Sequence, residues 1–207
     1  MARKRMGDTR RKQILEGLLK AVAKRGLQDC NMSDVAEAAG VSRGSLHYYF
    51  KNKYEIIGAL VADLRDTNLV AFHDQMDQID KPLTQLKESL WYPIKAFGKA
   101  GILLAKVWIE FWGYASHHAE VRSFINSVQQ SLRERYVEII KHGIESGSFS
   151  AEIQPERLAS VILATLEGLI LQWHFNPATF DFAAKVEEFE AMLVAYTKPP
   201  EAGSKGT

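Results

Sequence analysis

The sequence contains a single cysteine among its 207 residues. One cysteine cannot form an internal disulfide or a metal site that needs several thiolates, and its scarcity fits a reducing compartment. No apolar run reaches the roughly 18 residues of a membrane-spanning helix, because Glu167 interrupts the nearest candidate, VILATLEGLILQW. The basic residues at the N-terminus are not followed by the apolar run of a secretory signal. We therefore expect a cytoplasmic protein with no membrane partner.

The sequence also lacks the motifs of common enzyme classes. It contains no GxSxG, P-loop, HExxH or glycine-rich dinucleotide turn. His117 and His118 with Glu120 suggest a metal site at first sight, but neighbouring residues on a helix point about 100° apart. A cap at a helix end explains these residues better. We expect no enzymatic activity, no cofactor and no bound metal.

Charge is distributed unevenly along a chain whose net charge is only +1. Residues 1–53 carry twelve Lys and Arg against five Asp and Glu, a net +7, whereas the remaining residues carry fourteen against twenty, a net −6. A basic segment of this kind suits a polyanion, and a phosphate backbone fits best. The chain is 46% hydrophobic, which is enough for a buried core in one large or two small domains.

Apolar residues recur at helical spacing along the whole chain, and strand patterns are scarce. A first helix carries the stripe Ile14, Leu15, Leu18, Leu19 and Val22 and is expected to end at Gly26. Further helices are expected over about 33–39, 43–50, 54–72, 82–96, 99–116, 119–146, 155–175 and 182–197. The tail, residues 198–207, has a composition typical of disorder. The predicted fold class is all-α, with about nine helices in two domains.

Residues 31–50 have the pattern of a helix-turn-helix. Asn31, followed three residues later by Asp34, resembles a capping box at the start of the first short helix. Gly40 suits a tight turn, and Ser42 is a good N-cap for the second short helix. A helix-turn-helix lays its second helix in the major groove of DNA. The alternative is an ordinary helical bundle, in which such turns also occur and basic residues only solvate the surface.

The second short helix carries most of the candidate DNA contacts. Four of its polar residues are expected to project outward, where they reach base edges or phosphates, and Gly44 lets the backbone approach closely. Two residues at its end suit flanking phosphates. The first group is Arg43, Ser45, His47 and Tyr48; the second is Tyr49 and Lys53.

The run NMSDVAEAAGVSRGSLHYYFKNKYEII resembles the N-terminal domain of the TetR family of bacterial transcriptional regulators. The matching positions are Val35-Ala36, Ala39-Gly40-Val41-Ser42, Gly44-Ser45-Leu46, Tyr49-Phe50 and Asn52-Lys53. The resemblance covers residues 8–68 and implies a DNA-binding domain there. It also implies that Ser33, near the start of the first short helix, touches DNA. Two departures, His47 in place of the usual tyrosine and Asn31 in place of threonine or serine, leave the operator sequence open.

The resemblance implies that residues 75–197 form a helical domain for ligand binding and dimerisation. Members of the family hold a small molecule inside this domain, and large aromatic rings would line the cavity. The alternative is that the same rings simply fill the core. The candidate pocket residues are Trp91, Tyr92, Trp108, Phe111, Trp112, Tyr114 and Trp173. The segment TLEGLILQW resembles the BetI-like branch, whose namesake responds to choline. Rings with Glu110 or Glu167 would then cage a cation, although lipophilic or anionic ligands also stay open.

Helices 155–175 and 182–197 are the expected dimer surface, because the family builds a four-helix bundle across a two-fold axis there. The candidate interface residues are Leu158, Val161, Ile162, Gly168 and Leu169. Two recognition helices about 34–36 Å apart would then read a palindromic operator. We predict a homodimeric repressor that leaves double-stranded operator DNA when a small-molecule inducer of unknown identity displaces helix 54–72. The alternatives are a TetR-like activator and a helical protein-interaction module that does not bind DNA.

Overall fold

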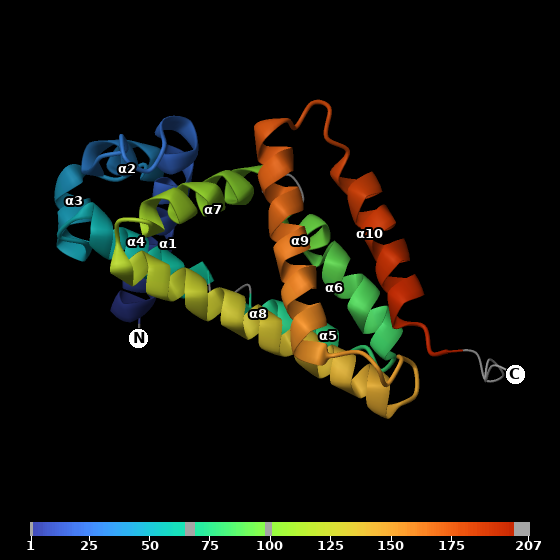
Figure 1. Ribbon diagram of the computed structural model, residues 1–207. Coiled ribbons are helices and arrows are strands. Elements are labelled where there is room, and N and C mark those ends of the chain that lie inside the picture. The colour runs from blue at the N-terminus through green and yellow to red at the C-terminus, as the bar shows by residue number, and fades with distance from the viewer. Residues whose placement is uncertain (1, 65–68, 98–100, 201–207) are drawn as a thin grey trace, which may run out of the picture. The chain divides into compact units, whose positions relative to one another are not determined.

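The computed structural model describes residues 2–64, 69–97 and 101–200. Within these ranges the chain forms ten α-helices and no strand (Figure 1). The all-α prediction is therefore confirmed. The helices are α1 (Ala2–Arg25), α2 (Met32–Ala39), α3 (Arg43–Tyr49), α4 (Lys53–Leu64), α5 (Val70–Asp77), α6 (Pro82–Phe97), α7 (Gly101–Ala115), α8 (Ala119–Glu145), α9 (Pro155–Phe175) and α10 (Phe182–Thr197).

The described residues give ten helices against the predicted nine because the segment predicted as one helix, 54–72, is described in two parts. We expected a single helix over 54–72, whereas the structure describes α4 up to Leu64 and α5 from Val70 onward. Residues 65–68 of the predicted helix lie outside the described part of the chain. The apolar stripe at helical spacing predicted the start of α4 to within one residue.

The chain divides into two compact units. Unit 1 holds residues 1–68 and 99–126, and thus α1 to α4, α7 and the first turns of α8. Unit 2 holds residues 69–98 and 127–207, and thus α5, α6, the rest of α8, α9 and α10. The segment 8–68, predicted as a DNA-binding domain, falls within unit 1, and α7 belongs to the same unit.

Unit 1 is built around α1, whose apolar side packs against α2, α4 and α7. Ile14, Leu18 and Val22 of α1 are buried, as the helical stripe predicted. The contact between α1 and α2 is very close at Gly17, where an added Cβ would lie 2.5 Å from the Cβ of Ala39. Nearby, the Gln13 amide Nε2 donates to the Ala39 carbonyl at 2.6 Å. Gly17 thus permits α2 to lie directly against α1.

Unit 2 has an apolar core formed by residues of α6, α8, α9 and α10. In this unit α9 and α10 pack against each other and run in opposite directions (Figure 1). The turn between α8 and α9 needs two glycines: Gly147 has φ of 71°, and Gly143 leaves the space that the ring of Phe149 occupies. The buried core residues include Leu86, Leu90, Tyr136, Ile139, Ile140, Phe149, Ile162, Leu166, Val186 and Leu193.

Candidate nucleic-acid interface and effector region

Residues 31–50 form the predicted helix-turn-helix. The side chain of Asn31 accepts hydrogen bonds from the backbone N–H of Ser33 and Asp34, and the Asp34 carboxylate accepts the Asn31 N–H at 2.9 Å. This reciprocal arrangement is the expected capping box. Gly40 ends α2 with φ of 64° and ψ of 36°, a left-handed conformation that glycine adopts without strain. The hydroxyl of Ser42 then caps α3 by accepting the Ser45 N–H at 3.1 Å.

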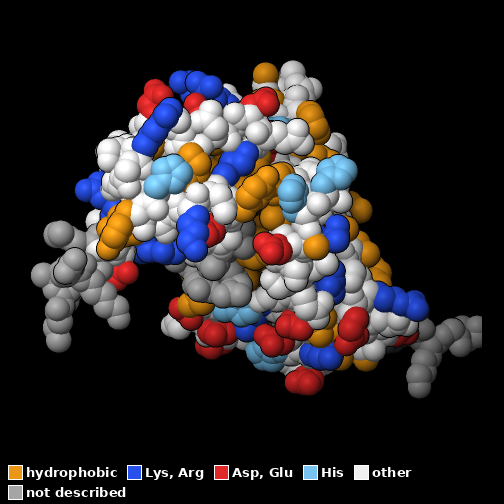
Figure 2. All heavy atoms as spheres, turned by 90° about the vertical axis from the view of Figure 1, so that its left-hand side faces the viewer, with side chains coloured by type: hydrophobic (Ala, Val, Ile, Leu, Met, Phe, Trp, Pro, Cys, Tyr) orange, Lys and Arg blue, Asp and Glu red, His pale blue; other side chains and the backbone are white. Residues whose placement is uncertain are grey.

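One side of α3 is buried and the other is exposed. Leu46 is fully buried, and Phe50, which follows the helix, is 2% exposed. Arg43, Gly44 and His47 are exposed, Ser45 is half-buried, and Tyr48 is 78% exposed. The exposed group contains all the predicted base contacts except Ser45. Figure 2 faces the side of the molecule that carries α3 and shows Lys, Arg and His side chains over the upper part of the view, interspersed with Asp and Glu.

The predicted backbone contacts have more varied surroundings. Tyr49 is half-buried, and its ring meets the Tyr48 ring edge to face, with the centroids 5.0 Å apart. Ser33 is half-buried at the start of α2. Lys53 is also half-buried and points back into the protein: its Nζ donates to the carbonyl oxygens of three residues. These are Leu27 at 2.7 Å, Gln28 at 3.2 Å and Cys30 at 2.8 Å. This arrangement differs from the expected one, in which the ammonium reaches a phosphate.

The segment between α1 and α2 receives a second contact, from α7. The carboxylate of Glu110 accepts the backbone N–H of Leu27 at 3.0 Å. Gly26, with φ of 82°, ends α1 beside the same carboxylate. Cys30 in this segment is 1% exposed, and burial raises the pKa of its thiol while the Lys53 ammonium opposes that shift. The Glu110 carboxylate therefore has a hydrogen-bond partner within unit 1.

An aromatic stack joins α4 to the end of α7. The ring of Tyr114 lies 3.7 Å from the ring of His118, nearly parallel to it, and 6.2 Å from the ring of Tyr54. Burial raises the pKa of the Tyr114 hydroxyl. No pattern in the sequence indicates this stack, because the three residues share no motif. His118 thus belongs to a packing contact, and the described residues contain no group of three His, Cys, Asp or Glu that could hold a metal.

The predicted pocket residues are divided between the two units. Trp108, Phe111, Trp112 and Tyr114 belong to unit 1, whereas Trp91, Tyr92 and Trp173 belong to unit 2. Phe111 is fully buried, and Trp108 lies 6.5 Å from Phe124 between ring centroids. The indole N–H of Trp112 is buried and has no hydrogen-bond partner among the residues the structure describes. The hydroxyl of Tyr114 is buried in the same way, so the set includes core residues and two polar groups without a partner among the described residues.

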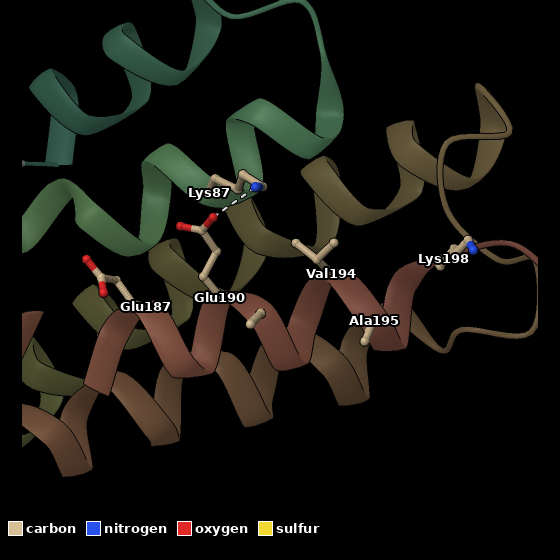
Figure 3. A pocket seen from close by; sticks show the side chains of 7 residues that line it. Lys87, Glu187, Glu190, Val194, Ala195 and Lys198 are labelled. Carbon is tan, nitrogen blue, oxygen red and sulfur yellow. Dashed lines mark ion pairs between the residues drawn. The ribbon is translucent and has the colours of Figure 1, made fainter. Parts of the chain in front are cut away.

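In unit 2, two predicted residues make specific contacts of a structural kind. The indole N–H of Trp91 donates to Glu190 at 2.7 Å, and the ring of Trp173 lies 5.5 Å from that of Phe182. Lys87 forms an ion pair with the same Glu190 at 2.9 Å. The ion pair of Lys87 and Glu190 borders an open groove of about 410 Å³ between α6 and α10 (Figure 3). None of the predicted pocket residues lines this groove.

The acid Glu167 on α9 is half-buried. Its carboxylate accepts a hydrogen bond from the amide of Gln129 on α8 at 2.8 Å. Burial raises the pKa of the Glu167 carboxyl, and the bond from Gln129 opposes this shift only in part. A half-buried carboxylate inside a helical unit is a candidate for contact with a ligand, but its present partner is an amide.

The outer sides of α9 and α10 carry a group of exposed apolar residues. Val161 and Phe175 on α9 are 55% and 75% exposed, and Met192 and Tyr196 on α10 are each 63% exposed. Sequence reasoning found Val161 but missed Met192 and Tyr196, although their spacing of four residues signals a common helix face. By length and composition alone α9 could also cross a membrane, a criterion that core helices of other proteins meet as well; 28% of its most apolar 18 residues are buried.

Two of the predicted dimer contacts are buried within their own chain. Ile162 is fully buried and Leu158 is 7% exposed, and both belong to the core of unit 2. A helix places residues four apart on one face, so the stripe that contains Leu158 and Ile162 faces the core of the same chain. Gly168 and Leu169 are half-buried, and Val161 points outward. The sequence does not distinguish the apolar residues of α9 that face the core from those that face outward, because both sides of the helix are apolar.

These features define a helical protein with an N-terminal helix-turn-helix, and comparison with known proteins places it in a family. Residues 14–60 match the model of the bacterial regulatory proteins of the tetR family, and residues 102–197 match that of the BetI-type transcriptional repressor C-terminal domain. The two models together match more than half of the chain. The chain belongs to the TetR family of helix-turn-helix transcriptional regulators.

Individual relatives agree with this assignment. The transcriptional regulator TtgR of Pseudomonas putida is 27% identical over 187 residues, which is 86% of this chain and 87% of TtgR. A transcriptional regulator from Saccharomonospora viridis in complex with choline has a TM-score of 0.82 at 18% identity, covering 91% of this chain and 97% of the other. FadR of Bacillus subtilis in complex with stearoyl-CoA has a TM-score of 0.77 at 21% identity, covering 89% and 98%. At these identities the two solved structures establish a shared fold.

Proposed function

We propose that this protein is a homodimeric repressor that binds a palindromic operator through α3 and leaves it when a small molecule binds the C-terminal helices. The observation that carries the proposal is the capped helix-turn-helix, which exposes the polar side of α3 on the most basic part of the chain. In this reading Arg43, His47 and Tyr48 reach base edges or phosphates, and Tyr49 lies next to the phosphate backbone. Cytoplasmic location follows from the work of such a regulator on DNA.

Gly44 supports a close approach of DNA to α3. An added Cβ at Gly44 would meet no protein atom within 4 Å, so packing inside the protein does not require a glycine there. Glycine also lowers helix stability by about 1 kcal/mol relative to alanine. Room for a neighbouring molecule outside the protein is a physical reason to keep it, and the sugar-phosphate backbone of DNA is such a neighbour.

A second copy of the chain would cover the apolar sides of α9 and α10. The exposed residues Val161, Met192 and Tyr196 lie on two helices that pack against each other in unit 2. A large exposed apolar patch of this kind marks an interaction surface. A two-fold axis through α9 and α10 would pair the two recognition helices, as a palindromic operator requires.

The fold alone does not indicate the chemical class of the effector. The two solved neighbours hold very different molecules, choline and stearoyl-CoA. The buried indole N–H of Trp112 in unit 1 is one polar group that a ligand could use, and the half-buried carboxylate of Glu167 in unit 2 is another, each within its own unit. Whatever binds must favour the state that does not bind DNA, since equal affinity for both states shifts nothing.

The experiment is selection of duplexes from the DNA upstream of the gene and from a random library, followed by gel-shift titration. Wild-type protein should enrich a palindrome. Arg43→Ala should relax selectivity at one or two base pairs, each contributing about 1–3 kcal/mol. Tyr49→Ala should weaken binding to all sequences alike, and Gly44→Ala should weaken binding while melting no earlier than wild type. Failure to enrich any duplex at low salt would exclude this function and leave the helical interaction module.

A further inference from the structure

Leu27 is held by hydrogen bonds on both sides of its Cα. Its N–H donates to the Glu110 carboxylate of α7 at 3.0 Å, and its carbonyl oxygen accepts from the Lys53 ammonium of α4 at 2.7 Å. The Leu27 side chain is fully buried. An acid and a base from different helices therefore fix the short segment between α1 and α2, residues 26–30, from opposite directions. We call this segment with Lys53 and Glu110 the Leu27 clamp.

The Lys53 ammonium has no hydrogen left for a phosphate in this arrangement. A lysine carries three N–H donors, and the carbonyl oxygens of Leu27, Gln28 and Cys30 accept one each. To reach DNA, the side chain would have to leave three carbonyl groups, two of them in part-buried bonds. A buried carbonyl that loses its donor raises the free energy of the folded state. Lys53 is thus better placed to hold the protein than to hold DNA.

The Leu27 clamp joins parts of the chain that belong to the two matched family models. Leu27 and Lys53 lie within residues 14–60, whereas Glu110 lies within residues 102–197. The first turn of α4, which begins with Lys53 and is separated from the end of α3 by three residues, has a second link to α7 through the stacked rings of Tyr54 and Tyr114. A displacement of α7 therefore acts on the start of α4 by two routes, one of which passes through Leu27.

We propose that Lys53 and Glu110 are positioning residues that set the orientation of α3 by clamping the segment at Leu27. The proposal rests on the proposed function, since it assigns a part in DNA binding to residues that do not touch DNA. It replaces the predicted phosphate contact of Lys53 and the predicted cation-binding role of Glu110.

The salt dependence of operator affinity separates positioning from phosphate contact. Each neutralised phosphate contributes about 0.9 to the slope of log affinity against log salt, so loss of one contact per protomer makes the slope of a dimer shallower by roughly 1.8. Lys53→Met should lower affinity for the selected duplex at least tenfold and leave the wild-type slope unchanged. Lys51→Met, which removes an exposed charge two residues away, is the matched control and should cost less affinity. A slope shallower by the expected amount in Lys53→Met would show a phosphate contact instead.

Substitution of Glu110 provides an independent test, because the expected change in affinity for DNA is opposite to the usual one. Removing an acid from a DNA-binding protein normally raises affinity for DNA, because repulsion decreases. Glu110→Leu should instead lower affinity at least fivefold, and Glu110→Gln should restore it because its amide oxygen can accept the Leu27 N–H. The control Glu120→Leu, at an exposed position of α8, should not lower affinity. Unchanged or raised affinity in a folded Glu110→Leu would overturn the proposal.

If a variant does not fold, hydrogen exchange in the wild-type protein tests the positioning role instead. The Leu27 amide should remain protected when the operator duplex is bound, since the clamp belongs to the DNA-binding state; loss of that protection on binding would contradict the proposal. Wild-type protein that binds no duplex would refute the proposed function and the positioning role with it. Wild-type binding with Lys53→Met and Glu110→Leu at wild-type affinity would refute the positioning role alone.

Discussion

Replacing Gly17 with alanine tests the close packing that supports the helix-turn-helix. The added Cβ would lie 2.5 Å, 2.8 Å and 2.9 Å from the Cβ, N and Cα of Ala39, whereas ordinary contacts begin at 3.4 Å. Two of these atoms are backbone, so α2 must move away from α1 by about half an ångström or more. Overpacking of this kind costs about 1–3 kcal/mol. Alanine recovers about 1 kcal/mol through its higher helix propensity, so the net loss is smaller than the strain.

Gly58→Ala is the matched control, because an added Cβ at that position of α4 meets nothing within 4 Å. It should gain up to about 1 kcal/mol from helix propensity alone. Urea unfolding followed by circular dichroism should therefore place Gly17→Ala about 1–3 kcal/mol below Gly58→Ala. Operator affinity should also fall in Gly17→Ala, since Ala39 immediately precedes the turn at Gly40. Equal free energies of unfolding for the two variants would refute the packing argument.

Two further predictions concern unit 2. Val161→Glu should raise the dimer dissociation constant at least tenfold in sedimentation equilibrium, because it places a charge in an apolar interface; Val70→Glu, equally exposed on α5, should leave the dimer intact. Dissociation by both variants or neither would argue against an interface at α9. Glu167→Gln should raise stability at neutral pH, because burial raises the pKa of this carboxyl above its ordinary 4.5 and disfavours the carboxylate. The folded protein holds this proton more tightly than the unfolded chain, so the advantage should disappear as the pH falls below 4.5. An advantage independent of pH in urea unfolding would contradict that cause.

Local chemistry in the sequence predicted much of the fold. The bounds expected for α9 and α10, 155–175 and 182–197, agree with the structure. Pro155 at the start of α9 and Asp181, which caps α10 by accepting the Ala184 N–H, are signals that act within one helical turn. The capping box at Asn31 and the turn at Gly40 could also be predicted, because both depend on residues close together in the sequence. The exposure of Tyr48 and Arg43 follows from the same helical spacing.

The remaining features depend on contacts between residues far apart in sequence. The bond between Leu27 and Glu110 spans 83 positions, and no periodicity indicates which distant backbone group an acid will reach. For the same reason the sequence predicts a phosphate contact for Lys53 and cannot indicate that its Nζ donates to the carbonyl oxygens of Leu27, Gln28 and Cys30. Ile162 and Val161 are adjacent residues on a helix apolar on two sides, and the choice of the buried one depends on where α8 and α10 lie.

The central claim is that the exposed side of α3 reads DNA, and one titration tests it most directly. A fluorescently labelled duplex carrying the selected palindrome is titrated with wild-type protein and with a triple variant, Arg43→Ala, His47→Ala and Tyr48→Ala, whose folding is checked by thermal melting. All three residues are exposed, so the variant should melt as wild type does. The account predicts tight binding by wild-type protein and at least a hundredfold weaker binding by the variant. Equal affinity of the two proteins for the duplex would contradict it.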